Sequence, residues 1–382
     1  MLASRLAAIG ESKSVSASNR AAEMKRAGKK VFNFGIGEPD FDTPSGIIEA
    51  AFEAARHGKT HYTPSAGIPE LREAVALKEK QFNRIDAKAG NVLITPTKFA
   101  INIAVMVLVN PGDEVIIPEP YYLSYPDIVR LYGGKVVTVR TDSNYDLDLD
   151  AMEKLVTPRT RMIILSNPTN PTGKVYTEKS LRSLADFAIK HKLYLLSDEI
   201  YEDLIYEGSM FSPASIPEMF ERTITLSGFS KSYAMTGWRL GYMVAPEEII
   251  KAGNKVQQQT ITCATSISQY GALAALKDRE TPRKFLETFR KRRDIVLELI
   301  SNSSNMHMRK PEGAFYAFVK YDADLNSEDF CENALESSGI VITPGSAFGN
   351  QGEGHFRLSF ATDEATIREG ISALEEFIRK IG

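Results

Sequence analysis

Short apolar runs alternate with helix-length amphipathic segments along the chain from about residue 46 to residue 280. Runs of this length suit strands that are buried on both faces, and the segments between them are long enough for helices. We therefore predict an α/β fold with a mostly parallel seven-stranded sheet and helices on both of its faces. The seven runs are Val92–Ile94, Val115–Ile117, Val136–Val139, Met162–Leu165, Tyr194–Leu196, Thr223–Leu226 and Tyr242–Val244.

The pattern changes after residue 280, where Thr281–Leu299 is typical of one long charged helix. Thr281 is the expected N-cap, and Pro282 falls in the first turn. We predict a large domain at residues 46–280 and a smaller α+β domain at residues 1–45 and 281–382, with the N-terminal segment folded back on the second part. Further elements of the smaller domain are expected at Ala314–Val319, Ile340–Ile342, His355–Ser359 and, as a final helix, Asp363–Ile381.

The charge balance excludes some classes of partner. The 382 residues include 46 Lys and Arg against 49 Asp and Glu, a net charge of −3. A chain this close to neutrality has no general field that attracts nucleic acid or an anionic membrane surface. Cys263 and Cys331 are the only cysteines and belong to no pairing or ligand motif, so we expect two buried thiols, no disulfide framework and no metal site.

The hydropathy pattern predicts no membrane-spanning segment. The longest apolar run, Phe99–Val109, is about half of the ~20 residues that a spanning helix needs. Residues 1–30 are rich in basic residues, Ser and Ala, as transit peptides are, but they contain Glu11 and Glu23. We interpret them as a surface helix of a cytoplasmic protein.

The segment Thr225–Tyr242 carries the strongest chemical signal. Lys231 follows a predicted strand and so lies at the carboxyl edge of the sheet, where ligands bind in such folds. An amine there can form a Schiff base, and Ser227, Ser230 and Arg239 can hold a phosphate through hydroxyls and a planar guanidinium. A surface lysine in a loop is the competing interpretation.

Three other motifs indicate ligand binding. Thr97 and Lys98 begin a predicted helix directly after a strand, which is a natural phosphate site. Arg357 alternates with apolar neighbours on a predicted strand, so it needs an anionic partner, either a bound carboxylate or a structural salt bridge. The pair Gly35 and Gly37 is not a dinucleotide fingerprint, since the third glycine is missing.

These motifs occur together in one order, and in that order the chain resembles the class I aminotransferases, pyridoxal 5′-phosphate (PLP) enzymes of fold type I. The resemblance is strongest to prokaryotic aspartate aminotransferases and covers about Gly35 to Ala361. It implies a homodimer with shared active sites that transfers the amino group of an L-amino acid, most simply aspartate, to a 2-oxo acid such as 2-oxoglutarate. Aromatic or alanine transamination, a PLP-dependent β-lyase and a PLP-binding regulator stay open as alternatives.

The resemblance also implies roles for residues around the cofactor ring. Lys231 would bind the cofactor covalently and move the substrate Cα proton. Asp198, in the stretch Leu196–Tyr201, would pair with the pyridine nitrogen, although a helix N-cap is the alternative. Tyr201 and Asn170 would donate hydrogen bonds to the O3′ oxygen of the cofactor. Asn170 would also contact the substrate carboxylate, with Asn167 as the weaker candidate. Both lie in a tight Pro-rich loop, and the sequence leaves open whether this loop contains a cis proline.

Further implied roles concern the phosphate and the ring face. Thr97, Lys98, Ser230 and Arg239 would hold the phosphate, although Pro96 stands where the family usually has Gly or Ser. The sequence does not decide whether Lys98 has this role or binds the distal carboxylate of the substrate. Tyr122 would stack on the ring, where aspartate-specific members often have tryptophan. We expect Tyr121 and Tyr125 to be core residues.

The remaining implied roles concern the substrate and the subunit interface. Arg357 and the backbone at Gly37 would bind the substrate α-carboxylate. Tyr62 would reach across a dimer interface to the neighbouring phosphate, with an ordinary loop tyrosine as the alternative. The sequence does not decide whether three aromatic residues line the substrate pocket or belong to the core: Phe315, Tyr316 and Phe348.

Overall fold

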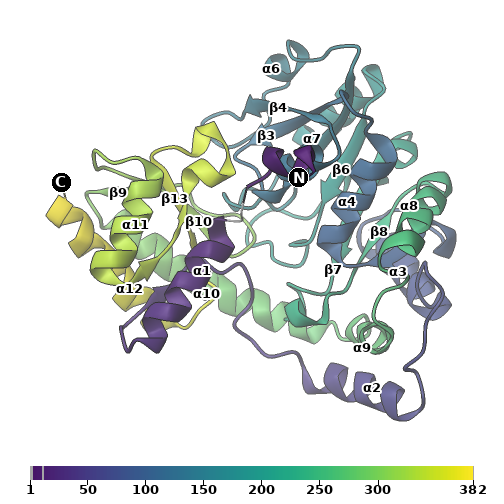
Figure 1. Cartoon of the computed structure of the whole chain (residues 1–382), viewed down its shortest axis with the longest axis horizontal. Coiled ribbons are helices and arrows are strands. Elements are labelled where there is room, and N and C mark those ends of the chain that lie inside the picture. The colour runs from purple at the N-terminus through teal and green to yellow at the C-terminus, as the bar shows by residue number, and fades with distance from the viewer. Residues whose placement is uncertain (1–2, 11–12, 382) are drawn as a thin grey trace.

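The computed structural model describes residues 3–10 and 13–381, so parts of the expected N-terminal surface helix and the last residue lie outside the described residues. Its centre is a seven-stranded sheet with strand order β2-β8-β7-β6-β5-β3-β4 (Figure 1). Strand β8 is antiparallel to both of its neighbours, and every other pair is parallel. The predicted α/β class is therefore confirmed. The strands are β2 Val92–Thr95, β3 Glu114–Glu119, β4 Lys135–Arg140, β5 Thr160–Ser166, β6 Tyr194–Asp198, β7 Thr223–Gly228 and β8 Gly241–Val244.

Helices cover both faces of this sheet because alternate strand residues point to opposite sides. Met162 and Ile164 of β5 pack in one cluster with α4 and α8, whereas Ile163 and Leu165 pack with α7 on the other face. A third cluster joins α3 and α9 to the β2 edge. The helices of this part are α2 Ser45–Arg56, α3 Pro69–Phe82, α4 Thr97–Leu108, α5 Ser124–Leu131, α6 Leu149–Glu153, α7 Glu178–Lys190, α8 Glu247–Thr260 and α9 Ser266–Ala275.

The C-terminal part contains a four-stranded antiparallel sheet of order β12-β13-β10-β9. The N-terminal segment lies against it: Ala21 packs on Leu335 and Val341, and β1 pairs with β11. The elements are α1 Lys13–Arg26, β1 Phe32–Asn33, α10 Glu280–Ser301, β9 Met306–Met308, β10 Tyr316–Tyr321, α11 Ser327–Ser338, β11 Ile340–Val341, β12 Thr343–Pro344, β13 His355–Ser359 and α12 Glu364–Ile381.

Two details differ from the sequence expectations. Helix α10 begins at Glu280, and the carboxylate of Asp278 accepts the amides of Glu280 and Thr281, so Thr281 lies inside the first turn and is not the N-cap. Cys331 is buried as expected, but Cys263 is only partly buried.

Short 3-10 helices lie at Ser4–Ala8, Ala89–Asn91, Pro213–Ser215, Phe220–Arg222, Thr236–Trp238, Gly345–Phe348 and Asn350–Gly352. Over residues 3–10 and 13–381, no helix combines the length and hydrophobicity that crossing a bilayer requires.

Candidate active site

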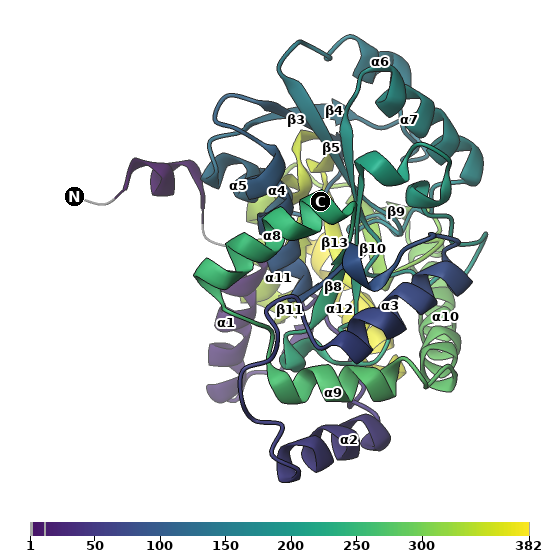
Figure 2. The same cartoon turned by 90° about the vertical axis from the view of Figure 1, so that its right-hand side faces the viewer.

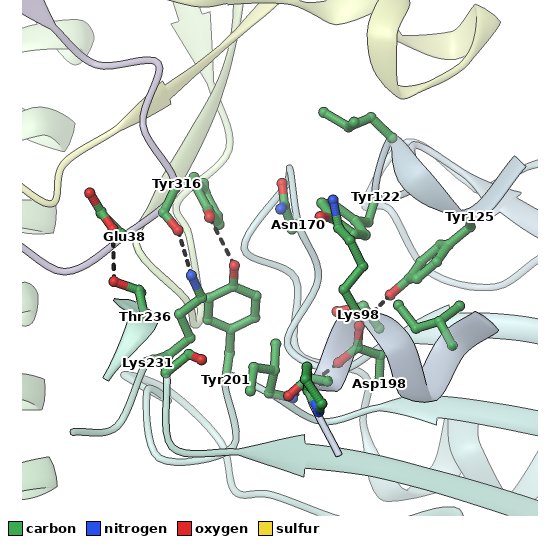
Figure 3. Close-up of a pocket in the computed structure, with 18 of the residues that line it drawn as sticks. Glu38, Lys98, Tyr122, Tyr125, Asn170, Asp198, Tyr201, Lys231, Thr236 and Tyr316 are labelled. Carbon is green, nitrogen blue, oxygen red and sulfur yellow. Dashed lines mark hydrogen bonds between the residues drawn. The ribbon is translucent and has the colours of Figure 1, made fainter. Parts of the chain in front are cut away.

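The carboxyl ends of β5, β6 and β7 border a cavity of about 430 Å³ (Figure 3). This is where ligands bind in open α/β sheets. Twelve residues are the preferred candidates for cofactor or substrate binding, and eleven of them line the cavity: Gly37, Thr97, Lys98, Tyr122, Asn170, Asp198, Tyr201, Ser230, Lys231, Arg239 and Arg357. The twelfth, Tyr62, lies elsewhere and is 87 % exposed.

Asp198 is the last residue of β6, so its carboxylate emerges at the strand end and enters the cavity. It accepts hydrogen bonds from the Tyr125 hydroxyl at 2.8 Å and from the Ile200 amide at 3.3 Å. Burial raises the pKa of Asp198 to about 6, against the lowering effect of these bonds and of the Lys231 charge. A cation beside this carboxylate would hold it ionised.

Tyr125 is a site residue that the sequence analysis assigned to the core. It is buried, as expected, but it also lines the cavity and orients Asp198. The missed signal is chemical, since a buried tyrosine hydroxyl usually finds a hydrogen-bond partner. Ile200, whose amide donates to Asp198, also lines the cavity.

Lys231 points across the cavity from the loop that follows β7. Its Nζ atom donates a hydrogen bond of 2.5 Å to the carbonyl of Gly37. The pKa of Lys231 is lowered to about 8, chiefly by burial. Glu38 and Asp198 act to raise this pKa, and Arg357 and Arg239 act to lower it. At pH 7 about a tenth of such amines are neutral, which makes Lys231 a far better nucleophile than an exposed lysine.

Tyr201 and Tyr316 meet at the cavity wall, where their hydroxyls are 2.8 Å apart. A Cβ atom at Gly37 would lie 2.6 Å from the Tyr316 hydroxyl, so glycine is what lets the backbone approach here. Of the three aromatic residues left open, Tyr316 lines the cavity, whereas Phe315 and Phe348 are fully buried in the core.

Arg357 lies on β13 and is 2 % exposed. Its guanidinium donates to Asn170 Oδ1 at 3.1 Å, to the Gly35 carbonyl at 2.8 Å and to the Thr343 hydroxyl at 3.3 Å. Its Nε atom is buried without a hydrogen-bond partner, and no carboxylate of the described residues pairs with it. A buried cation held only by neutral acceptors is suited to an anionic ligand, whereas the structural salt bridge considered from the sequence is not found among these residues.

Of the two candidate asparagines, only Asn170, the one preferred from the sequence, lines the cavity. The Asn170 side chain faces the cavity and holds Arg357. Asn167 is buried, accepts the amide of Tyr176 at 2.9 Å and does not line the cavity. Both proline peptide bonds that the sequence left open in this loop are cis, Asn167–Pro168 and Asn170–Pro171.

Further residues that line the cavity can donate hydrogen bonds to an anion. Thr97 begins α4, so its amide and that of Lys98 are free of helical partners. The Thr97 side chain sits against the backbone of Gly228 and Gly241, where a Cβ atom on Gly241 would lie 2.1 Å from Oγ1. The Lys98 ammonium lies over the Tyr122 ring, 5.7 Å from its centroid.

Ser230 and Arg239 also line the cavity, whereas Ser227 does not. Ser227 is fully buried and donates its hydroxyl to Glu202 on the far side of the strand, so the expectation that it holds a phosphate is wrong. The physical reason is the alternation of the strand, which turns Ser227 away from the cavity.

The donor chemistry of the cavity fits PLP. An amine, Lys231, can bind an aldehyde, and a carboxylate, Asp198, can pair with a pyridine nitrogen. The amides of Thr97 and Lys98 and the guanidinium of Arg239 suit a phosphate, and Tyr122 offers an aromatic face. The Arg357 guanidinium, which pairs with no carboxylate of residues 3–10 and 13–381, is suited to the carboxylate of a second molecule.

Comparison with known proteins identifies relatives over nearly the whole chain. A family model described as aminotransferase class I and II matches residues 29–374. The aromatic-amino-acid aminotransferase 2 of Thermococcus litoralis is 42 % identical over 359 residues, which cover 92 % of each chain. The aspartate/prephenate aminotransferase of Thermus thermophilus is 40 % identical over 388 residues, 100 % of this chain and 99 % of the relative.

The fold has close counterparts among solved structures. The aspartate aminotransferase of Thermus thermophilus with maleate superposes with a TM-score of 0.94 at 39 % identity, and 99 % of each chain is covered.

Proposed function

The chain belongs to the family of class I and II aminotransferases, and on that premise we propose that it uses PLP to transfer the amino group of L-aspartate to 2-oxoglutarate. The observation that carries the proposal is the buried Arg357 guanidinium, which has no carboxylate partner among the described residues and lies in the cavity of Lys231 and Asp198.

Each residue has a distinct task in this proposal. PLP would supply an electron-withdrawing ring, which makes the proton on the substrate Cα more acidic. The Asp198 carboxylate would hold the positive charge of the pyridine nitrogen, and Tyr201 and Asn170 would donate to the ring oxygen. The amides of Thr97 and Lys98, with Ser230 and Arg239, would hold the phosphate.

Lys231 would bind the cofactor first and act as the base afterwards. Once the amino acid had replaced it, the Nζ atom would be free to take the proton from the substrate Cα and to deliver it to the C4′ carbon of the cofactor. A pKa of about 8 suits both directions of this transfer near neutral pH. Arg357 and Asn170 would orient the α-carboxylate so that the Cα proton faces Lys231.

The choice of aspartate rests on Lys98, an exposed ammonium at the cavity, above Tyr122. A carboxylate on the substrate side chain would find a partner there. The competing preference is for aromatic amino acids, since a ring could instead stack on Tyr122, and a relative named as an aromatic-amino-acid aminotransferase is as similar as those named for aspartate.

The Lys98→Met variant separates these two substrates. Loss of one charged hydrogen-bond donor should lower kcat/KM for L-aspartate by about 30-fold, and that for L-tyrosine should change less than about threefold. Steady-state kinetics with both donors and 2-oxoglutarate would measure this. The matched variant is Arg357→Lys, which should reduce kcat/KM for both donors alike because every substrate has an α-carboxylate.

An equal loss for both donors in Lys98→Met would contradict the role in aspartate binding and assign Lys98 to the phosphate.

A β-lyase would instead release pyruvate from a cysteine conjugate with no added oxo acid.

We also propose a homodimer, in which Tyr62 of one subunit contacts the phosphate of the other. Tyr62 is 87 % exposed, and Phe52 on α2 and Ile267 on α9 are exposed at 61 % and 38 %. Helices α2 and α9 lie side by side at one edge of the molecule (Figures 1 and 2) and border an apolar hollow that adjoins Arg239. Apolar exposure of this kind is typical of an interface.

The cytoplasmic location stays a prediction.

The Phe52→Glu variant tests the interface. Wild-type protein should sediment at about twice the chain mass of 42.3 kDa, whereas a buried charge in the variant should shift it toward the monomer. Affinity for PLP should fall by at least about tenfold in parallel, because each site would lose the partner's tyrosine. A monomeric wild type with full PLP affinity would rule out the shared site.

A further inference from the structure

The segment from Gly35 to Thr43 lines the cavity at Gly37 and Glu38 and is fixed on both sides of them. On one side, the Gly35 carbonyl accepts a hydrogen bond from Arg357 at 2.8 Å. Asp40 forms a two-bond ion pair with Arg292 of α10, at 2.6 and 2.8 Å. Thr43 donates its hydroxyl to the Ala234 carbonyl at 2.7 Å and accepts from the indole of Trp238 at 3.0 Å. Gly37 and Glu38 are therefore held over the loop that carries Lys231.

Two neighbouring residues of this segment contact two residues of that loop (Figure 3). Lys231 Nζ donates to the Gly37 carbonyl at 2.5 Å, and the Thr236 hydroxyl donates to Glu38 Oε2 at 2.8 Å. Each contact limits the freedom of the other, because Gly37 and Glu38 are adjacent and Lys231 and Thr236 share one loop. The bond at Glu38 thus helps to keep the carbonyl on the amine.

Glu38 also differs from the other acidic group near Lys231. The charged groups that act on the amine are Glu38, Asp198, Arg239 and Arg357. Both carboxylates raise the pKa of Lys231, and the effect of Glu38 is the larger one. Asp198 is directed at the pyridine nitrogen in the proposed function, whereas Glu38 forms no ion pair with any described residue and stays at the cavity mouth.

We propose that Glu38, fixed by the Thr236 hydroxyl, is a positioning residue that keeps the Gly37 carbonyl on Lys231 and offsets the two guanidiniums beside that amine. This inference rests on the proposed function, because it concerns the amine that binds PLP. Without the Glu38 charge, the two arginines would act on Lys231 with less opposition, and the amine would release a proton more readily.

A pH titration of the visible absorbance of the PLP-loaded enzyme tests the proposal, because the band reports the proton on Lys231 Nζ. Glu38→Gln removes the charge but keeps an oxygen that can accept from Thr236. The midpoint should fall by about 0.5 to 1 pH unit at low salt. Since Glu38 is solvent-exposed, the difference should shrink in about 1 M KCl.

Variants of Thr236 separate position from charge. Thr236→Val frees the carboxylate and should lower the midpoint by less than Glu38→Gln, whereas Thr236→Ser keeps the hydroxyl and should match the wild type. Glu376→Gln is the control, since this exposed glutamate of α12 pairs only with Lys380 in the part of the chain described. A purely structural role for Glu38 would move the melting temperature and leave the midpoint unchanged.

The outcomes separate the two proposals. An unchanged midpoint in Glu38→Gln at low salt would overturn the role of Glu38 while leaving the proposed function intact. A wild-type protein that shows no PLP band would instead contradict the proposed function.

Discussion

The Lys231→Ala variant should lose amino transfer by at least about 10⁴-fold, the upper range of what a positioned proton-transfer group contributes. The loss has two causes, since the variant has neither the amine that binds the cofactor nor the base that takes the substrate proton. Its visible spectrum should resemble that of free PLP. Stopped-flow mixing with L-aspartate, followed by assay of oxaloacetate, would measure the remaining rate.

Two further lysine substitutions make this result specific. Lys231→Arg keeps the positive charge but cannot attack the aldehyde, so it should be about as inactive as Lys231→Ala. Lys190→Ala removes an exposed lysine of α7 that pairs with Glu153, and it should transfer amino groups at the wild-type rate. Substantial turnover in Lys231→Arg would mean that Lys231 acts only through its charge.

The Asp198→Asn variant should show the second largest effect, a loss of kcat of about 10³-fold. An amide cannot balance a protonated pyridine nitrogen, so the ring would no longer withdraw electrons strongly enough from the substrate. Cofactor binding should persist, because Lys231 and the phosphate ligands are unchanged. Single-turnover kinetics would detect a slow chemical step beneath a visible band of normal intensity.

Tyr125→Phe is the matched control for that result. It keeps the Asp198 carboxylate but removes the 2.8 Å hydrogen bond that favours the charged form, so the pKa of Asp198 should rise further. Its activity should lie between those of the wild type and Asp198→Asn and should fall more steeply toward acidic pH. If Asp198→Asn kept the wild-type kcat, the pairing with the pyridine nitrogen would be wrong.

The sequence predicted the large sheet well because each strand is a distinct apolar run between helical segments. Strands β9 and β12 were not expected, since three and two residues are too short to show a periodic pattern. The start of α10 was misplaced because Thr281 and Asp278 are both good capping residues, and only the fold shows which one accepts the amides.

Candidate site residues were found where they stand in short motifs at strand ends. Local spacing does not reveal contacts between distant parts of the chain, such as the Tyr125 hydroxyl on Asp198 or the Thr236 hydroxyl on Glu38. The same limit applies to Arg357, whose alternation with apolar residues indicated an anionic partner without showing that no described carboxylate supplies it.

Chemical trapping of the cofactor is the most direct test of the central claim, that Lys231 binds PLP in an aminotransferase site. The PLP-loaded protein is reduced with borohydride, digested and analysed by mass spectrometry. The account predicts a phosphopyridoxyl group on Lys231, and its loss when L-aspartate is added before reduction, because the cofactor then carries the amino group away from the lysine. A label on Lys98 or another lysine, or one on Lys231 that no amino acid removes, would contradict it.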